Sequence, residues 1–158
     1  MDALDKALVA GLSEDGRRPV QQLGEEAGVT GPTVRARLQN LQKSGVFKVA
    51  GLVDPARVEE IVICLIGIRL EKFNLAEKLN EIAMLRGVSW AAVVAGRYDV
   101  MAEVISHQGN EGISRFVVEE LGRVEGILST ETFIVMRPQN KWVLPPPGMV
   151  EDWRGGGK

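Results

Sequence analysis

The chain has 158 residues, a formal net charge of −2 and 45% hydrophobic residues, which is typical of a globular protein with one large or two small domains. No apolar run approaches the roughly 18 residues that a membrane-spanning helix needs, and the first residues lack the basic and apolar regions of a signal peptide. The single cysteine, Cys64, excludes an internal disulfide and is expected to be a buried, inert thiol. We therefore expect a cytoplasmic protein with no membrane partner.

The N-terminal third of the chain has apolar residues at helical spacing, which predicts three short helices. The first covers about residues 2–13. The second ends at Gly28, where a tight turn leads into the third, which Thr30 caps and which runs to Ser44. Three helices with so short a turn are typical of a helix-turn-helix. Residues 46–53 alternate loosely, as the strands of a wing or a linking strand would.

Charge is distributed unevenly along this N-terminal part. Residues 1–29 contain six acidic and three basic side chains, whereas residues 30–50 contain four basic ones and no acidic one. A local basic surface matters more for binding a phosphate backbone than the net charge does. The alternative interpretation is a chance cluster on a solvated surface.

The third predicted helix has the two sides that a helix in the DNA major groove needs. Its apolar side carries Val34, Leu38 and Leu41, and its other side carries hydrogen-bonding groups without a carboxylate. Arginine, asparagine and glutamine side chains can pair with base edges. A solvated amphipathic helix is the competing interpretation. We predict contacts with double-stranded DNA at Thr30, Thr33, Arg35, Arg37, Asn40, Lys43 and Lys48.

From residue 61 onward the pattern changes to strand, helix, strand, strand, helix, strand, which is the order of a ferredoxin-like α+β domain. The predicted ranges are 61–70, 75–85, 88–95, 99–105, 113–121 and 130–136. Both alternating sets of side chains in the first strand are apolar, so both faces of the sheet must be covered. The helices cover one face, and we predict that a second copy of the chain covers the other in a homodimer.

A possible ligand site lies at the tip of the second hairpin, between two apolar strands. Gly96 can adopt a positive φ angle, Arg97 can bind a carboxylate, and Asp99 can bind an ammonium group, as a free amino acid requires. A plain β-turn with a solvated charge pair is the alternative. The predicted ligand-binding residues are Gly96, Arg97, Tyr98, Asp99, Thr130 and Thr132.

The sequence offers little for catalysis. His107 is the only histidine, and we find no Cys/His cluster for zinc, no phosphate-binding glycine loop and no Ser/His/Asp set. We therefore predict no catalytic residue, no metal site and no cofactor. The proline- and glycine-rich residues 138–158 are expected to form a mobile or peripherally packed tail. Alternatively, Trp142 and Trp153 dock on a neighbouring subunit.

Short segments spread from residue 2 to residue 137 form a specific combination. In the N-terminal part they are Leu4-Asp5, Glu14-Asp15-Gly16-Arg17, Leu23 to Val29, Thr33-Val34, Arg37-Leu38, Leu41 and Gly45-Val46. In the C-terminal part they are Val94 to Val100, Gly126-Ile127 and Thr130 to Val135. The combination resembles the Lrp/AsnC, or feast/famine, family of transcription regulators. Gly31 and Ala36 depart from the residues usual in that family, so the DNA sequence that relatives bind does not carry over.

The resemblance implies a winged helix-turn-helix, a ligand-sensing domain that binds amino acids or related metabolites, and assembly into dimers and often octamers. It also implies that residues 96–99, Thr130 and Thr132 belong to the ligand site. We divide the chain into a DNA-binding domain (1–54), a linker (55–60), a sensing and dimerisation domain (61–137) and a tail (138–158). The leading hypothesis is an effector-responsive regulator. The alternatives are an architectural DNA-binding protein without an effector and an enzyme built on the ferredoxin-like domain.

Overall fold

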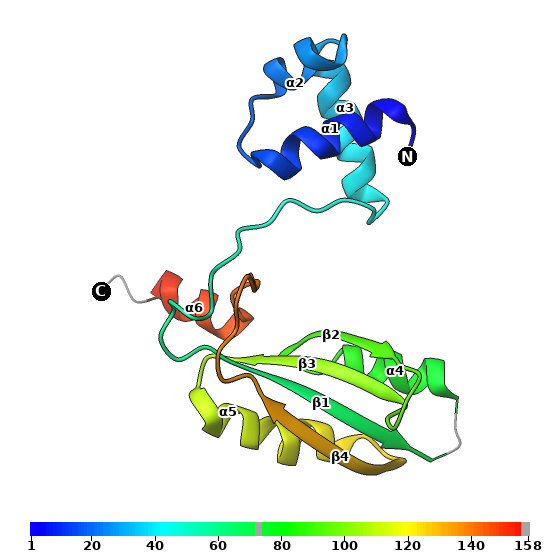
Figure 1. The fold of residues 1–158 in the computed structure, drawn as a ribbon, viewed down its shortest axis with the longest axis vertical. Coiled ribbons are helices and arrows are strands. Elements are labelled where there is room, and N and C mark those ends of the chain that lie inside the picture. Colours follow the sequence, from blue (N-terminus) through cyan, green and yellow to red (C-terminus); the bar gives the residue numbers. More distant parts are fainter. Residues whose placement is uncertain (72–73, 156–158) are drawn as a thin grey trace. The chain divides into compact units, whose positions relative to one another are not determined.

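A computed structural model describes residues 1–71 and 74–155. By its internal contacts the chain divides into two compact units, one formed by residues 1–51 and one that begins at Leu52 (Figure 1). The first predicted boundary, after residue 54, lies close to this division. Each unit has a hydrophobic core of its own.

The N-terminal unit consists of three helices, α1 (Ala3–Glu14), α2 (Val20–Ala27) and α3 (Gly31–Lys43). Leu8, Leu23 and Val34 come from the three helices in turn and are almost fully buried against one another. Burying each such side chain stabilises the fold by about 1.5–3 kcal/mol. The predicted three-helix unit is confirmed.

The turn between α2 and α3 depends on two glycines. Gly28 ends α2 with φ 68°, a left-handed conformation that disfavours other residues. The Val29 amide donates a hydrogen bond of 2.8 Å to the Gly24 carbonyl. A Cβ atom at Gly24 would lie 2.6 Å from the Val29 carbonyl oxygen, so this approach of the two segments needs a residue without a side chain.

The predicted wing strands are not formed. Residues 46–52 make no strand pairing, and only Val53 forms a bridge, with Val143. Val46 and Val49 are exposed. An extended segment becomes a strand only when a neighbouring backbone accepts and donates its ladder hydrogen bonds, and among residues 1–71 and 74–155 of the single chain no segment supplies them before Val53. The segment is therefore a linker.

The C-terminal unit has the predicted order of elements. They are β1 (Val62–Leu70), α4 (Leu75–Ala83), β2 (Val88–Val93), β3 (Val100–Ser106), α5 (Gly109–Arg115), the π-helical turn η1 (Phe116–Glu120), the 3₁₀ turn η2 (Leu121–Arg123), β4 (Ile127–Ile134) and α6 (Pro147–Gly155). The strands form one sheet in the order β2-β3-β1-β4, and every neighbouring pair is antiparallel. This topology confirms the ferredoxin-like α+β prediction.

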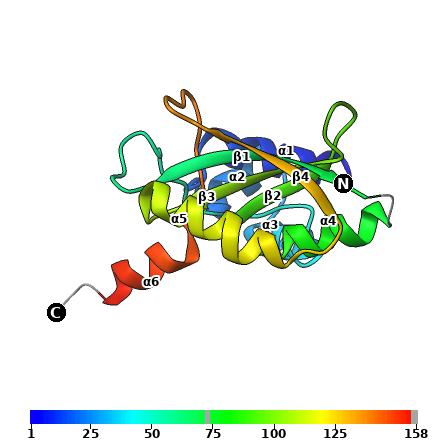
Figure 2. The same ribbon diagram turned by 90° about the horizontal axis from the view of Figure 1, so that it is seen from below.

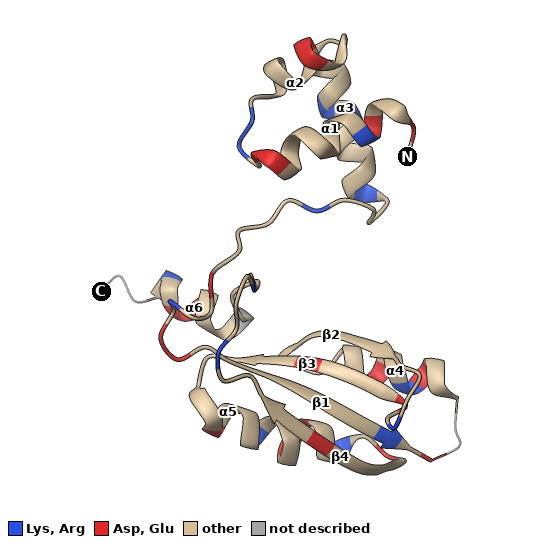
Figure 3. Cartoon of the chain, viewed as in Figure 1, with Lys and Arg blue, Asp and Glu red and all other residues tan. Residues whose placement is uncertain are grey.

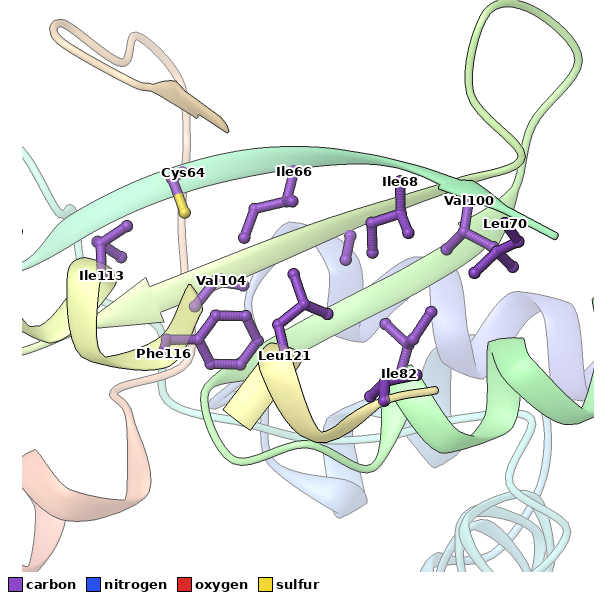
Figure 4. Packing of buried hydrophobic residues seen from close by; sticks show 12 residues of the cluster. Cys64, Ile66, Ile68, Leu70, Ile82, Val100, Val104, Ile113, Phe116 and Leu121 are labelled. Carbon is purple, nitrogen blue, oxygen red and sulfur yellow. The ribbon is translucent and has the colours of Figure 1, made fainter. Parts of the chain in front are cut away.

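One face of the sheet is covered by α4 and α5 (Figure 2). Ile66 and Ile68 of β1 point towards Ile82 of α4 and Phe116 of η1 (Figure 4). Cys64 lies in the same cluster with no exposed surface, which confirms the predicted buried thiol. Burial raises the pKa of this thiol to about 11.

The opposite, helix-free face of the sheet is also largely apolar, as predicted, although Glu103 and Glu131 lie on it. The strand register places Leu65 opposite Phe133, and Trp90 and Leu65 both opposite Glu103, so these side chains share the face. Trp90 is 43% exposed and Phe133 is 42% exposed. We use the name helix-free face for the surface formed by Leu65, Trp90, Met101 and Phe133.

The middle of the tail is packed, which fits the predicted alternative of a peripherally packed tail. Val143 is 3% exposed and contacts Ile63 and Ile105. Met149, in α6, is also buried, whereas Trp142 and Trp153 are exposed. No helix among residues 1–71 and 74–155 is long and apolar enough to cross a membrane.

Candidate DNA-binding surface and effector site

The polar side of α3 forms an exposed surface without acidic residues. Figure 3 shows basic residues on α3 and on the segment after it, and acidic residues on α1 and α2. Thr30 is the N-cap of α3, but its hydroxyl lies 2.9 Å from the Thr33 hydroxyl and caps no backbone amide. Six of the seven predicted DNA-contacting residues are exposed: Thr30, Thr33, Arg35, Asn40, Lys43 and Lys48.

Arg37 is the exception, because it is held by acidic side chains of α1. Its Nη1 donates hydrogen bonds to the carboxylates of Asp2 and Asp5, the latter at 3.3 Å. Arg37 lies one helical turn before the buried Leu41, so it projects from the edge of α3 that faces α1. Arg37 therefore ties the recognition helix to α1, and its predicted DNA contact stays a prediction.

The same cluster fixes the beginning of α1. Asp2 accepts a hydrogen bond from the Asp5 amide, and Asp5 accepts one from the Asp2 amide, which is a reciprocal capping box. The hydrogen bond from the Asp5 amide and then the one from Arg37 lower the pKa of Asp2 from its ordinary value of 3.8. The carboxylate of Asp2 is therefore stabilised in its charged form.

The C-terminal unit has a cavity of about 390 Å³ beside the hairpin tip and β4. It brings together three of the predicted ligand residues and three others that sequence reasoning missed. Its lining residues are Arg69, Arg97, Tyr98, Ser129, Thr130 and Glu131. The two arginines, the Tyr98 hydroxyl and the Glu131 carboxylate could bind a small zwitterion.

Tyr98 forms one wall of this cavity and lies against β1. A Cβ atom at Gly67 would lie 2.6 Å from the Tyr98 ring, so only glycine lets the ring approach the strand this closely. The edge of the ring meets Phe133 at a centroid distance of 6.3 Å. The Tyr98 hydroxyl is buried without a hydrogen-bond partner among the described residues. Such an unsatisfied group costs free energy, so it is a candidate contact for an added molecule.

Arg97 has two neighbours at the mouth of the cavity. Its guanidinium carbon lies 5.2 Å from the centroid of the Tyr98 ring, a cation–π distance. Its Nη2 lies 3.4 Å from Oε2 of Glu131, and the Arg97 side chain is largely exposed. An exposed ion pair of this kind is weak, so both groups are available to a ligand.

Three predicted ligand residues lie outside the lining of the cavity. Asp99 accepts a hydrogen bond of 2.8 Å from the Leu70 amide, so its carboxylate holds the end of β1. Gly96 does not have a positive φ angle, so the prediction that a left-handed conformation requires glycine at this position is wrong. A Cβ atom there would also meet nothing within 4 Å. Thr132 is paired with Ile66 and faces the helix-covered side, whereas Glu131 is paired with Gly67 and shares the side of Tyr98.

His107 contributes to a second cavity of about 360 Å³, next to α6. Its Nε2 lies 3.7 Å from Oδ2 of Asp152, and its ring packs against Gly148. Within residues 1–71 and 74–155, no group of three or more His, Cys, Asp or Glu side chains is placed to hold a metal ion. The contacts of His107 with Gly148 and Asp152 thus join it to the tail.

Two family models match the chain. The model of the AsnC-type helix-turn-helix domain matches residues 1–42, and that of the Lrp/AsnC ligand-binding domain matches residues 63–141. An uncharacterised helix-turn-helix transcriptional regulator of Pyrococcus furiosus is 32% identical over 143 residues, which cover 90% of this chain and 95% of the relative.

Solved structures have the same fold. AsnC of Escherichia coli superposes with a TM-score of 0.67 at 25% identity, covering 92% of this chain and 99% of that one. A transcriptional regulator of Neisseria meningitidis, solved in complex with L-methionine, gives a TM-score of 0.69 at 20% identity, covering 95% and 99% of the two chains. The chain thus belongs to the Lrp/AsnC family and is a transcriptional regulator with a helix-turn-helix domain and a ligand-binding domain.

Proposed function

We propose that this regulator acts in the cytoplasm as a homodimer on double-stranded DNA and that a free amino acid, bound in the Arg97–Tyr98 cavity, modulates it. The observation that carries the effector site is the cavity of about 390 Å³, which is lined by Arg97, Tyr98 and Thr130 and lies in the size range of small-molecule sites. The Neisseria meningitidis relative in complex with L-methionine supports an amino acid as the ligand.

In this proposal each charge of the amino acid has a counterpart. Arg97 binds the α-carboxylate, because a guanidinium donates two parallel hydrogen bonds to a carboxylate. Glu131 accepts from the ammonium group in place of Asp99, whose Oδ2 already accepts from the Leu70 amide. The hydroxyl of Tyr98 supplies a further hydrogen bond. When the amino acid binds, Arg97 and Glu131 give up their contact with each other, and each pairs with the group of opposite charge on the ligand.

The test is a thermal-shift screen of the twenty amino acids followed by calorimetric titration of any that bind. Arg97→Ala should weaken binding tenfold or more, since hydrogen bonds to charged groups contribute about 1.5–3 kcal/mol. Arg86→Ala is the matched control, because Arg86 is exposed and lies outside this cavity. Unchanged affinity of the Arg97 variant would remove the site. No shift with any amino acid would favour the architectural alternative.

We further propose that the exposed polar side of α3 contacts DNA through Thr30, Thr33, Arg35, Asn40, Lys43 and Lys48. Lys43 lies in the last turn of α3, where it suits a phosphate better than a base. Each phosphate contact contributes about 0.9 to the slope of log affinity against log salt concentration. Because the proposed homodimer carries two copies of Lys43, Lys43→Ala should lower that slope by about 1.8 on a paired site. Lys6→Ala, an exposed lysine of α1, should not, and equal effects of the two would argue against this surface.

The homodimer is proposed to form through the helix-free face. Trp90 and Phe133 are each exposed by more than two fifths there, and an exposed apolar patch on a sheet marks an interface. Phe133→Asp should convert the dimer to a monomer in light scattering at micromolar concentration. Val118→Asp is the control, since Val118 is 72% exposed and lies in η1 on the helix-covered side. A Phe133→Asp variant that remains dimeric would refute this interface.

A further inference from the structure

The tail holds the linker that leads to the DNA-binding unit. The Val53 amide donates a hydrogen bond of 2.9 Å to the Val143 carbonyl, and the Val143 amide donates one of 3.0 Å to the Val53 carbonyl. Val143 is buried against Ile63 and Ile105 of the sheet. Figure 1 shows the two segments, one from each end of the C-terminal unit, meeting beside the sheet. Linker, tail and sheet are thus joined at one point.

A buried ion pair anchors the tail two residues earlier. Lys141 Nζ contacts Oε2 of Glu103, which is only 5% exposed on β3. The Ser89 hydroxyl donates a hydrogen bond of 2.6 Å to the other carboxylate oxygen. A buried carboxylate that lost its cation would be strongly unfavourable, so the charge of Glu103 keeps Lys141 in place. The tail is therefore attached to the sheet by two neighbouring contacts, the ion pair of Lys141 and the apolar packing of Val143.

This attachment sets how much chain is free between the two units. On the N-terminal side the last backbone tie is the hydrogen bond from the Phe47 amide to the Leu41 carbonyl. With Val53 held, the free segment is residues 48–52, which is five residues. Without the tail the next tie is Glu60, whose carbonyl accepts from the Gly109 amide. Counted by backbone hydrogen bonds alone, the segment between the two ties would then be residues 48–59, which is twelve residues and includes the buried Pro55.

We propose that Val143 and Lys141 are positioning residues for DNA binding: they clamp the linker at Val53 and so limit the reach of each DNA-binding unit. The proposal rests on the homodimer proposed above, whose two units bind two half-sites. The effective concentration of a tethered second unit falls with about the −3/2 power of linker length. Lengthening the free segment from five to twelve residues therefore lowers affinity for a paired site about fourfold, and it widens the range of tolerated half-site spacings.

The experiment compares full-length variants on duplexes obtained by selection of random DNA with the parent protein. Val143→Asp breaks the apolar contact, and Lys141→Glu places like charges beside Glu103. Trp142→Ala, an exposed neighbour, and the conservative Val143→Ile are the matched controls. Affinity is measured for duplexes with one half-site, with two half-sites, and with two half-sites separated by added base pairs. Hydrogen exchange of the Val53 amide reports the clamp itself.

Both disruptive variants should retain the affinity of the parent for one half-site, lose about fourfold for two, and accept a wider range of spacings. Their Val53 amide should exchange faster, and both controls should match the parent.

A folded Val143→Asp variant with the parent's spacing profile would overturn the proposal, as would an equal loss of affinity for duplexes with one and with two half-sites. If both variants unfold the C-terminal unit, fast exchange of Val53 in the parent would overturn it and protection would support it. If the homodimer proposal itself is wrong, the parent protein should bind the duplex with one half-site and the duplex with two half-sites with equal affinity.

Discussion

Arg37 and Arg35 lie two residues apart in α3 but have different surroundings, which gives a residue-level test. Arg37 binds Asp2 and Asp5, whereas Arg35 is exposed. Arg37→Ala should lower the thermal midpoint of the N-terminal unit, because it leaves two neighbouring carboxylates without their cation. Arg35→Ala should leave that midpoint unchanged and weaken DNA binding by about 1–3 kcal/mol if Arg35 contacts a base. Circular dichroism melts and gel-shift titrations distinguish the two, and identical behaviour would contradict the distinction.

The lowered pKa of Asp2 predicts how the stability of this unit depends on pH. A carboxylate with a lowered pKa in the folded state stabilises it above the unfolded-state pKa, which is near 3.8, and this contribution is lost as the pH falls through the folded-state value. Asp2→Asn keeps a capping side chain but removes the charge. The variant should therefore be less stable than the parent at pH 7, and this difference should shrink as the pH falls from 3.8 through the lowered folded-state pKa. A stability difference that stayed constant over this fall in pH would contradict the assignment.

Cys64 should be unreactive in the folded protein. Burial raises the pKa of its thiol to about 11, and only the thiolate is nucleophilic. A disulfide reagent at pH 8 should therefore modify Cys64 only after denaturant is added. Labelling without denaturant at the rate of a free thiol would show that the sheet opens readily.

At the level of elements, the turn between α2 and α3 depends on a close backbone contact at Gly24. Gly24→Ala should destabilise the unit by about 1–3 kcal/mol, the usual cost of overpacking, because its Cβ would lie 2.6 Å from the Val29 carbonyl oxygen. Gly31→Ala is the control, since its Cβ would meet Val20 at an ordinary 3.8 Å. Urea denaturation measures both, and equal stability of the two variants would show that the turn can relax.

The order of elements could be predicted from the sequence because each element has its own periodicity. The π-helical turn at Phe116–Glu120 and the absence of wing strands could not, because both depend on hydrogen-bond partners that periodicity does not define. The candidate effector site was predicted in part. Arg97, Tyr98 and Thr130 meet at one cavity, but Arg69 and Glu131 join them only through the register of β1 against β4.

The role of Arg37 was also beyond the sequence pattern alone. Its type and spacing suit a DNA contact, whereas its hydrogen bonds to Asp2 and Asp5 join residues that are more than thirty positions apart in the chain. The sequence does contain the three residues involved, which are the acidic N-cap Asp2, the acidic Asp5 three positions later, and Arg37 at the edge of the third helix. Only the packing of α3 on α1 brings them together.

At the level of the whole molecule, two units with separate cores should unfold in two transitions. A ligand that binds only the folded C-terminal unit should shift the transition of that unit alone, because it raises the free energy of unfolding of that unit by about 2.7 kcal/mol at a ligand concentration of 100 Kd. Scanning calorimetry with and without the amino acid found in the screen measures both. A single cooperative transition that shifts as a whole would show that the two units are energetically coupled.

The pairing of Val53 with Val143 also has a consequence for building chimeric regulators. By its backbone hydrogen bonds Val53 belongs to the C-terminal unit, although the chain reaches it before the sheet begins. A fusion that joins a foreign DNA-binding domain at residue 51 would keep the complete C-terminal unit, including the pairing of Val53 with Val143. A fusion joined seven or eight residues later would lose Val53, so Val143 would have no backbone partner from this chain.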